Sequence, residues 1–220
     1  MDAQLRARLS EIVSRSGVSE RLDSVSPRSA AEVEAVCRAC AELATPISVV
    51  SGPATGPAPG GRAITVTLGR LDAVAADAGA MVVRAGAGAT LGALGAAVDA
   101  VGMALVGIEV AGPGAARHVG SVVARGQVAR RALTGVEAVL PGGEVVRSGG
   151  GVLKDVTGYD LAGVLLGSMG RLALITEVVL RLQPGRARTT APERPLGPPS
   201  ASSDLLRRAF DPEGLLVAAR

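Results

Sequence analysis

The sequence predicts an α+β fold, in which short strands alternate with helices at both ends and in the middle of the chain. Apolar residues recur at helical spacing near the N-terminus and after Thr90, whereas short β-branched runs and one long run at Leu172–Leu182 are typical of strands. The 220-residue chain is long enough for a sizeable core. Tyr159 and Phe210 are its only aromatic residues, so that core must depend on many modest contacts between small side chains.

The first half of the chain is predicted to contain two helices and two strands. Ser29 followed three residues later by Glu32 forms a capping box, which predicts the start of a helix. Glycines and prolines at 51–61 exclude regular structure after the first strand. The predicted helices cover residues 2–15 and about 29–43, and the predicted strands cover 47–50 and 63–68.

The second half is predicted to be richer in strands. Thr90 is expected to cap a helix that ends at Gly102, and residues 141–144 predict a hairpin turn. Residues 185–202, rich in Pro, Arg, Ser and Thr, are typical of a linker. The predicted strands cover residues 81–85, 119–124, 133–140, 145–147 and 172–182, and short helices are expected at 159–166 and 204–210.

Charge and cysteine usage exclude several classes of protein. The net charge of +3 comes from scattered arginines without interleaved aromatics, which indicates a solvated surface rather than a nucleic-acid interface. The N-terminus lacks an apolar signal core and no apolar run is long enough to span a membrane, so a soluble cytoplasmic protein is expected. Cys37 and Cys40 have redox spacing, but their place inside a predicted helix favours plain packing. With one His and no acid or Cys cluster, no metal site is expected.

The most informative segment runs from Gly149 to Pro184. It contains the only Lys, Lys154, and the only Tyr, Tyr159, among many glycines that allow the backbone to approach a bulky ligand closely. Gly158-Tyr159-Asp160-Leu161, followed by Gly167-Ser168-x-Gly170-x-Leu172-x-x-Ile175-Thr176-Glu177, resembles the signature of FAD-linked oxidases, the vanillyl-alcohol-oxidase-type superfamily with a PCMH-type FAD-binding domain. LKDVTGYDL at 153–161 is most similar to the glycolate oxidase FAD-binding subunit and its D-lactate dehydrogenase-like relatives.

This resemblance covers about residues 22–184 and implies a domain of two α+β subdomains, at about 22–75 and 76–184. It also implies FAD as the cofactor, with the pyrophosphate bound by backbone N–H groups of glycine-rich turns. No Rossmann GxGxxG follows a strand. The cofactor-binding residues that the resemblance implies are Ser51, Gly52, Thr55, Gly56, His118, Val119, Gly120, Ser121, Gly158, Tyr159, Gly170 and Ile175; no catalytic residue is assigned.

The chain departs from the family pattern at five places. The mildest is in the second loop, where a Gly-Gly pair of the family is Gly120-Ser121 here. Prolines interrupt the first phosphate loop at 51–56, and prolines have no N–H to donate. A segment of the family is missing after Gly126, and Arg171 stands beside Gly170, where it would either clash with the cofactor or pair with its phosphates. The family's cap domain is also missing. The expected division is therefore a FAD-binding domain at 1–184, a linker at 185–202 and a C-terminal helix and tail at 203–220.

Several residues have two interpretations. His118 is either a general base or covalent flavin anchor, or an ordinary loop residue, and the second is favoured because it precedes the flavin loop. Tyr159 and Asp160 either touch the flavin or serve as a core plug and a helix cap. Lys154 is either a ligand for a carboxylate or phosphate, or a solvated loop residue.

The sequence supports two hypotheses about function. The first is a FAD-binding oxidoreductase subunit acting on a CH–OH donor such as a small hydroxy acid, with its pocket completed by a partner subunit or by a homodimer. The alternative is a degenerate, non-catalytic family member that serves as a binding or scaffolding subunit with weak or no FAD. The altered loop at 51–56 and the gap after Gly126 favour the second hypothesis.

Overall fold

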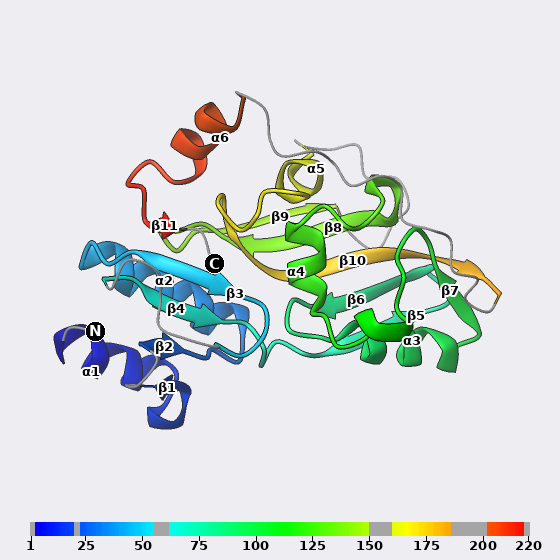
Figure 1. The fold of residues 1–220 in the computed structure, drawn as a ribbon, viewed down its shortest axis with the longest axis horizontal. Coiled ribbons are helices and arrows are strands. Elements are labelled where there is room, and N and C mark those ends of the chain that lie inside the picture. Colours follow the sequence, from blue (N-terminus) through cyan, green and yellow to red (C-terminus); the bar gives the residue numbers. More distant parts are fainter. Residues whose placement is uncertain (1–2, 20–22, 55–61, 150–159, 186–201, 218–220) are drawn as a thin grey trace.

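The chain folds into two β-sheets with helices packed against them (Figure 1). The computed structural model describes residues 3–19, 23–54, 62–149, 160–185 and 202–217. The α+β class expected from the sequence is confirmed. The buried apolar side chains form two groups, one at each sheet, and the group at the first sheet also includes Val139 and Leu174 of the second.

The first sheet combines early strands with the end of the chain. Its order is β1 (Val18–Ser19), β2 (Ser24–Val25), β4 (Ile64–Thr67), β3 (Ile47–Val50) and β11 (Leu216–Val217). The neighbours from β2 to β11 are parallel, and β1 pairs with β2 in the antiparallel sense. Both carboxylate oxygens of the buried Asp211 accept hydrogen bonds from the backbone of Leu215 and Leu216. This contact orients the tail into β11, a strand that the sequence did not predict.

Two helices accompany this sheet, α1 (Ala3–Ile12) and α2 (Ala30–Glu42). The predicted cap of α2 is confirmed, because the Ser29 side chain accepts a hydrogen bond from the backbone of Glu32. Cys37 and Cys40 are buried in the core on α2 and are unbridged. Burial raises the pKa of both thiols, that of Cys40 to about 12, so neither forms a reactive thiolate near neutral pH.

The second sheet is antiparallel and is built around one long strand. Its order is β5 (Val74–Asp77), β6 (Val82–Gly86), β10 (Leu174–Pro184), β8 (Leu133–Val139) and β9 (Val145–Gly149), and β7 (Met103–Leu105) pairs with the far end of β10. The predicted hairpin between β8 and β9 is confirmed, with Gly143 at φ +91°. The short strands β5 and β7 were not predicted.

The remaining helical elements cover or border this second sheet (Figure 1). The Thr90 side chain accepts a hydrogen bond from Ala93 and so caps α3, and Gly102 follows the helix at φ +70°, as predicted. The helices are α3 (Leu91–Ala100), α4 (Val119–Ala124), α5 (Leu161–Leu165) and α6 (Ser202–Phe210), with 3-10 turns η2 (Gly112–Gly114) and η3 (Arg130–Ala132). A further 3-10 turn, η1 (Arg15–Gly17), follows α1 and lies at the first sheet.

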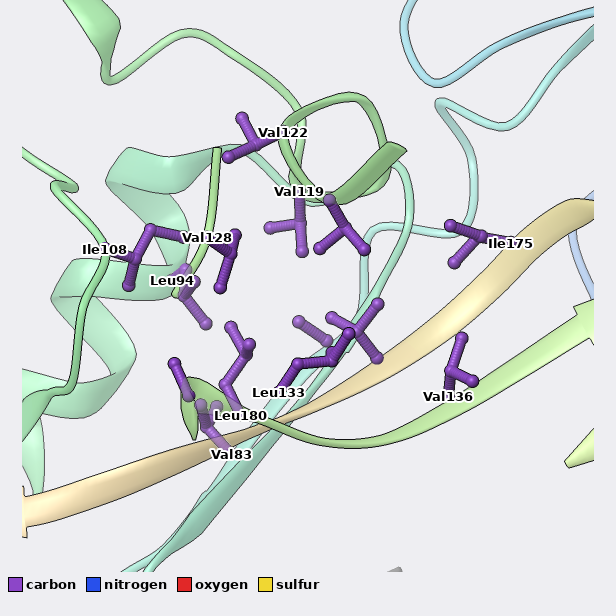
Figure 2. Close-up of a cluster of buried hydrophobic side chains, with 14 of the residues drawn as sticks. Val83, Leu94, Ile108, Val119, Val122, Val128, Leu133, Val136, Ile175 and Leu180 are labelled. Atoms are coloured by element: carbon purple, nitrogen blue, oxygen red, sulfur yellow. The ribbon is translucent and has the colours of Figure 1, made fainter. Parts of the chain in front are cut away.

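The strand predicted at residues 119–124 is wrong, because this segment forms helix α4. Its β-branched residues suggested a strand, but Val119, Val122 and Val123 have the i, i+3, i+4 spacing of one helical face. All three are buried in the cluster that contains Leu133 and Leu180 of the sheet, and Figure 2 shows Val119 on the side of α4 that faces these two residues. Tertiary packing therefore overrides the local preference for a strand.

The turn between β6 and α3 joins the two sheets. Gly86 and Gly88 donate hydrogen bonds to the carbonyls of Ala73 and Leu71, in the segment that leaves the first sheet. A β-carbon on Gly88 would lie 2.2 Å from the carbonyl oxygen of Leu68. Only glycine therefore allows the two backbones to approach this closely.

Gly88→Ala is expected to lower the free energy of unfolding by about 1–3 kcal/mol, because the new methyl group meets backbone that cannot rotate away. Thermal or urea unfolding measures this loss. Gly142→Ala is the matched control, since a β-carbon at Gly142 has no neighbour within 4 Å. Equal stability of the two variants would contradict the close approach at Gly88.

Candidate functional site

A cavity of about 200 Å³ lies where the end of β3, helix α4 and the start of β10 meet. Its walls come from three segments that are far apart in the sequence. Ser51 and Gly52 follow β3, His118 to Arg125 include α4, and Met169 to Ile175 lead into β10. The lining residues are Val49, Val50, Ser51, Gly52, Leu68, His118, Gly120, Ser121, Ala124, Arg125, Met169, Gly170, Ala173 and Ile175.

The first two segments pack into each other through their glycines. A β-carbon on Gly52 would lie 2.6 Å from Cε1 of His118, so the imidazole rests directly on the Gly52 backbone. A β-carbon on Gly120 would lie 2.7 Å from Oγ of Ser51. The His118 side chain thus packs on Gly52, and the Ser51 side chain packs on Gly120. These two contacts fix the distance between the loop after β3 and the start of α4 at one wall of the cavity.

The third segment holds the opposite end of α4. The backbone N–H groups of Gly167 and Met169 donate hydrogen bonds of 3.1 and 2.8 Å to the carbonyls of Val123 and Ala124. Gly167, Met169 and Gly170 have φ values of +80°, +57° and +69°, a left-handed conformation that only glycine adopts without strain. The loop at 167–170 therefore turns sharply to cap α4 and then enters β10.

Seven of the residues expected at a FAD site line this cavity: Ser51, Gly52, His118, Gly120, Ser121, Gly170 and Ile175. Val119 instead points into the core of the second sheet (Figure 2). Thr55, Gly56, Gly158 and Tyr159, together with Lys154, lie outside the described residues.

Sequence reasoning missed half of the lining residues, among them Arg125 and Met169. Both stand beside predicted positions, but neither belongs to the glycine pattern that identified the site. Arg171, which was considered as a phosphate partner, lines a smaller pocket with Asp204 and Arg207 of α6 instead.

The cavity is mostly neutral. Arg125 is the permanently charged residue of its described lining, and the half-buried His118 is the other titratable one. The described residues contain no cluster of three or more His, Cys, Asp or Glu side chains that would hold a metal ion. None of the described helices has the length and apolar content needed to cross a bilayer.

Beside the cavity segments, Asp160 fixes the start of α5. Its side chain accepts a hydrogen bond from the backbone of Gly163, which makes it the N-cap. Arg130 forms an ion pair with the same carboxylate and also donates to the carbonyl of Leu133. The hydrogen bond from Arg130 lowers the pKa of Asp160 below its usual value. This arrangement supports the interpretation of Asp160 as a helix cap.

A two-sheet α+β domain with a cavity built from glycine turns defines a class of nucleotide-binding flavoprotein domains, and the comparisons identify the family. A model of the FAD binding domain family matches residues 24–149, which is more than half of the chain. The chain therefore belongs to this family, and FAD is its cofactor. The cavity is smaller than the roughly 300–1,000 Å³ of typical small-molecule sites.

Two relatives illustrate the similarity in sequence. D-lactate dehydrogenase of Archaeoglobus fulgidus is 31% identical over 169 residues, which cover 73% of this chain and 38% of that protein. Glycolate oxidase subunit GlcD of Bacillus subtilis is 44% identical over 57 residues, which cover 26% of this chain and 12% of that protein. The chain thus spans well under half the length of the curated relatives it matches.

A solved structure agrees with the fold. P-cresol methylhydroxylase with bound substrate superposes with a TM-score of 0.62 at 17% identity, covering 83% of this chain and 43% of that chain. The similarity shows the PCMH-type fold. No cap domain is inserted between β10 and α6, since the intervening residues 185–201 are far fewer than a domain needs.

Asp160→Asn is expected to lower the free energy of unfolding at neutral pH by about 0.2–1 kcal/mol, because both partners of its ion pair are largely exposed. A carboxylate with a lowered pKa stabilises the fold above its usual pKa of about 4, and this contribution is lost as the pH falls through the lowered value. The difference between the native chain and the variant should therefore shrink below about pH 4. Thermal unfolding from pH 7 to pH 2 measures it, with the exposed Asp99→Asn as control. A difference that does not change with pH would contradict the assignment.

Gly52→Ala and His118→Ala are expected to be non-additive in stability. The methyl group at residue 52 displaces the imidazole, so Gly52→Ala alone is destabilising, whereas the same change costs little once the ring is removed. A double-mutant cycle by urea unfolding should give a coupling of about 0.5–3 kcal/mol. His118→Ala combined with Gly142→Ala should be additive. An additive first cycle would show that the two loops are not in contact.

Proposed function

We propose that this chain is the FAD-binding part of an oxidoreductase, with part of the cofactor seated in the cavity between β3, α4 and the start of β10. The observation that carries the proposal is that distant segments of the chain meet at one cavity. Three glycine-containing segments that lie far apart in the sequence, and that the family resemblance implies as cofactor-binding, meet around this cavity. Backbone N–H groups at such turns suit the diphosphate of a dinucleotide.

The residues have distinct parts in this proposal. Ser51 and Ser121 supply polar side chains at the cavity wall, while Ala124, Ala173 and Ile175 supply an apolar surface that excludes water. Gly52 and Gly120 let the two loops approach each other. When bound, FAD supplies the acceptor for a hydride, and the protein contributes binding, orientation and electrostatics.

We further propose a small hydroxy acid as the substrate and a partner subunit or second copy as the completion of its pocket. The names of the relatives support this, since they include D-lactate dehydrogenases and two subunits of glycolate oxidase. The described cavity encloses too little volume for a dinucleotide and a substrate together. In this proposal residues 1–184 form the cofactor domain, and residues 203–220 complete its first sheet through β11, which pairs with β3.

A second candidate function is a non-catalytic binding or scaffolding subunit that retains the fold with weak or no FAD. Pro53 favours it, because the turn after Gly52 lacks one backbone donor that a diphosphate would use. The two candidates differ in one measurable property, the affinity for FAD.

Purified protein is expected to bind FAD, with flavin absorbance retained after gel filtration and a melting temperature raised by added cofactor. At a hundredfold excess over Kd the stabilisation is about 2.7 kcal/mol, or roughly 5–10 °C for a chain of this length. Ser121→Trp, which fills the cavity, should weaken binding more than about tenfold, whereas Ala100→Trp at the exposed end of α3 should not. No shift at millimolar FAD would favour the non-catalytic candidate, and equal binding by both Trp variants would place the cofactor elsewhere.

A further inference from the structure

The cavity contains one feature that the glycine pattern does not explain, the side chain of Arg125. This residue ends α4, is exposed, and lines the cavity beside Ser121 and Ala124. No acidic residue is among the lining residues, and within the described part of the chain the guanidinium has no ion pair or hydrogen bond. The local charge of the cavity is therefore positive.

Arg125 is not needed to complete the end of α4. An arginine at a helix C-terminus often bonds the last carbonyls, but here backbone donors already occupy them. The N–H of Gln127 bonds the carbonyl of Val122, and the N–H groups of Gly126 and Gly167 bond that of Val123. Met169 bonds the carbonyl of Ala124. The guanidinium is therefore available to a ligand.

The loop after β3 offers one backbone N–H fewer to a ligand, because it contains Pro53. Ser51 and Gly52 line the cavity, but Pro53 follows them and has no N–H. A guanidinium offers five N–H donors in a planar fork and binds phosphate oxygens in a bidentate manner. Arg125 at the end of α4 can therefore supply N–H donors to a ligand in this cavity, whereas Pro53 in the loop after β3 cannot.

We propose that Arg125 is the anion-binding residue of this cavity and contacts a phosphate oxygen of the FAD diphosphate. The inference rests on the proposed function and deepens it, because it assigns the charge recognition to one side chain instead of to backbone turns alone. Since the contact would join a guanidinium to a phosphate, binding should weaken as the ionic strength rises.

Three probes separate phosphate recognition from contact with the rings: FAD, ADP and riboflavin, of which only the last has no phosphate. Their dissociation constants are measured by calorimetric or fluorescence titration of the full chain at low and at high salt. Arg125→Gln should weaken FAD and ADP about 10- to 100-fold, the range of one charge-assisted hydrogen bond, and should flatten the salt dependence. Riboflavin should bind equally to both proteins, and Arg125→Lys should restore part of the loss.

The matched control is Arg181→Gln, which removes the same charge from the exposed face of β10, away from the cavity lining. Arg125→Gln should unfold at the temperature of the native chain, because its side chain makes no structural contact among the described residues. If FAD binds the native chain but Arg125→Gln and Arg181→Gln bind it equally well, this inference is overturned while the proposed function stands. If the native chain binds neither FAD nor ADP, the proposed function fails and this inference fails with it.

Discussion

The close crossing of two backbones at the turn from β6 to α3 is the constraint on which the rest of the structure depends. In this turn Gly86 and Gly88 bond the segment that leaves the first sheet, and the N–H of Ala87 bonds the carbonyl of Thr176 in β10. These hydrogen bonds attach the turn to both sheets, and Val139 and Leu174 of the second sheet are buried in the same cluster as the side chains of the first sheet. A β-carbon at either glycine would approach a carbonyl oxygen within 2.2 Å, so no other residue type allows this junction.

The same turn positions the cavity. The carbonyls of Ala87 and Ala89 accept hydrogen bonds from Gly120 and Val119, so the first turn of α4 is attached to the sheet junction. The other end of α4 is held by Gly167 and Met169. The helix that supplies one cavity wall is therefore fixed at both ends by backbone bonds, and its position does not depend on a ligand.

Local chemistry made much of the fold predictable from the sequence. The caps at Ser29 and Thr90 and the hairpin turn at residues 141–144 depend on neighbouring residues alone, and all three formed as expected.

The strand β11 was missed because it pairs with β3, which lies far from it in the sequence. Helix α4 was mistaken for a strand because the type of its valines was weighed above their spacing. The glycine positions of the cavity were predictable from the motif. The place of Arg125 in the lining was not, because it depends on the three-dimensional packing of α4 against the loop at 167–170.

The amino-acid composition limits which groups can shape the cavity and which can give it charge. No Phe, Tyr or Trp is among the described residues that line the cavity, so its shape there comes from backbone and from small side chains such as Ala124 and Ala173. Backbone turns provide a cavity of defined shape but little charge, and Pro53 reduces the number of donors further. The proposed role of Arg125 adds to this cavity a charged side chain that can reach an anionic cofactor. Arg125 is available for this role because the loop at 167–170 already completes the helix on which it stands.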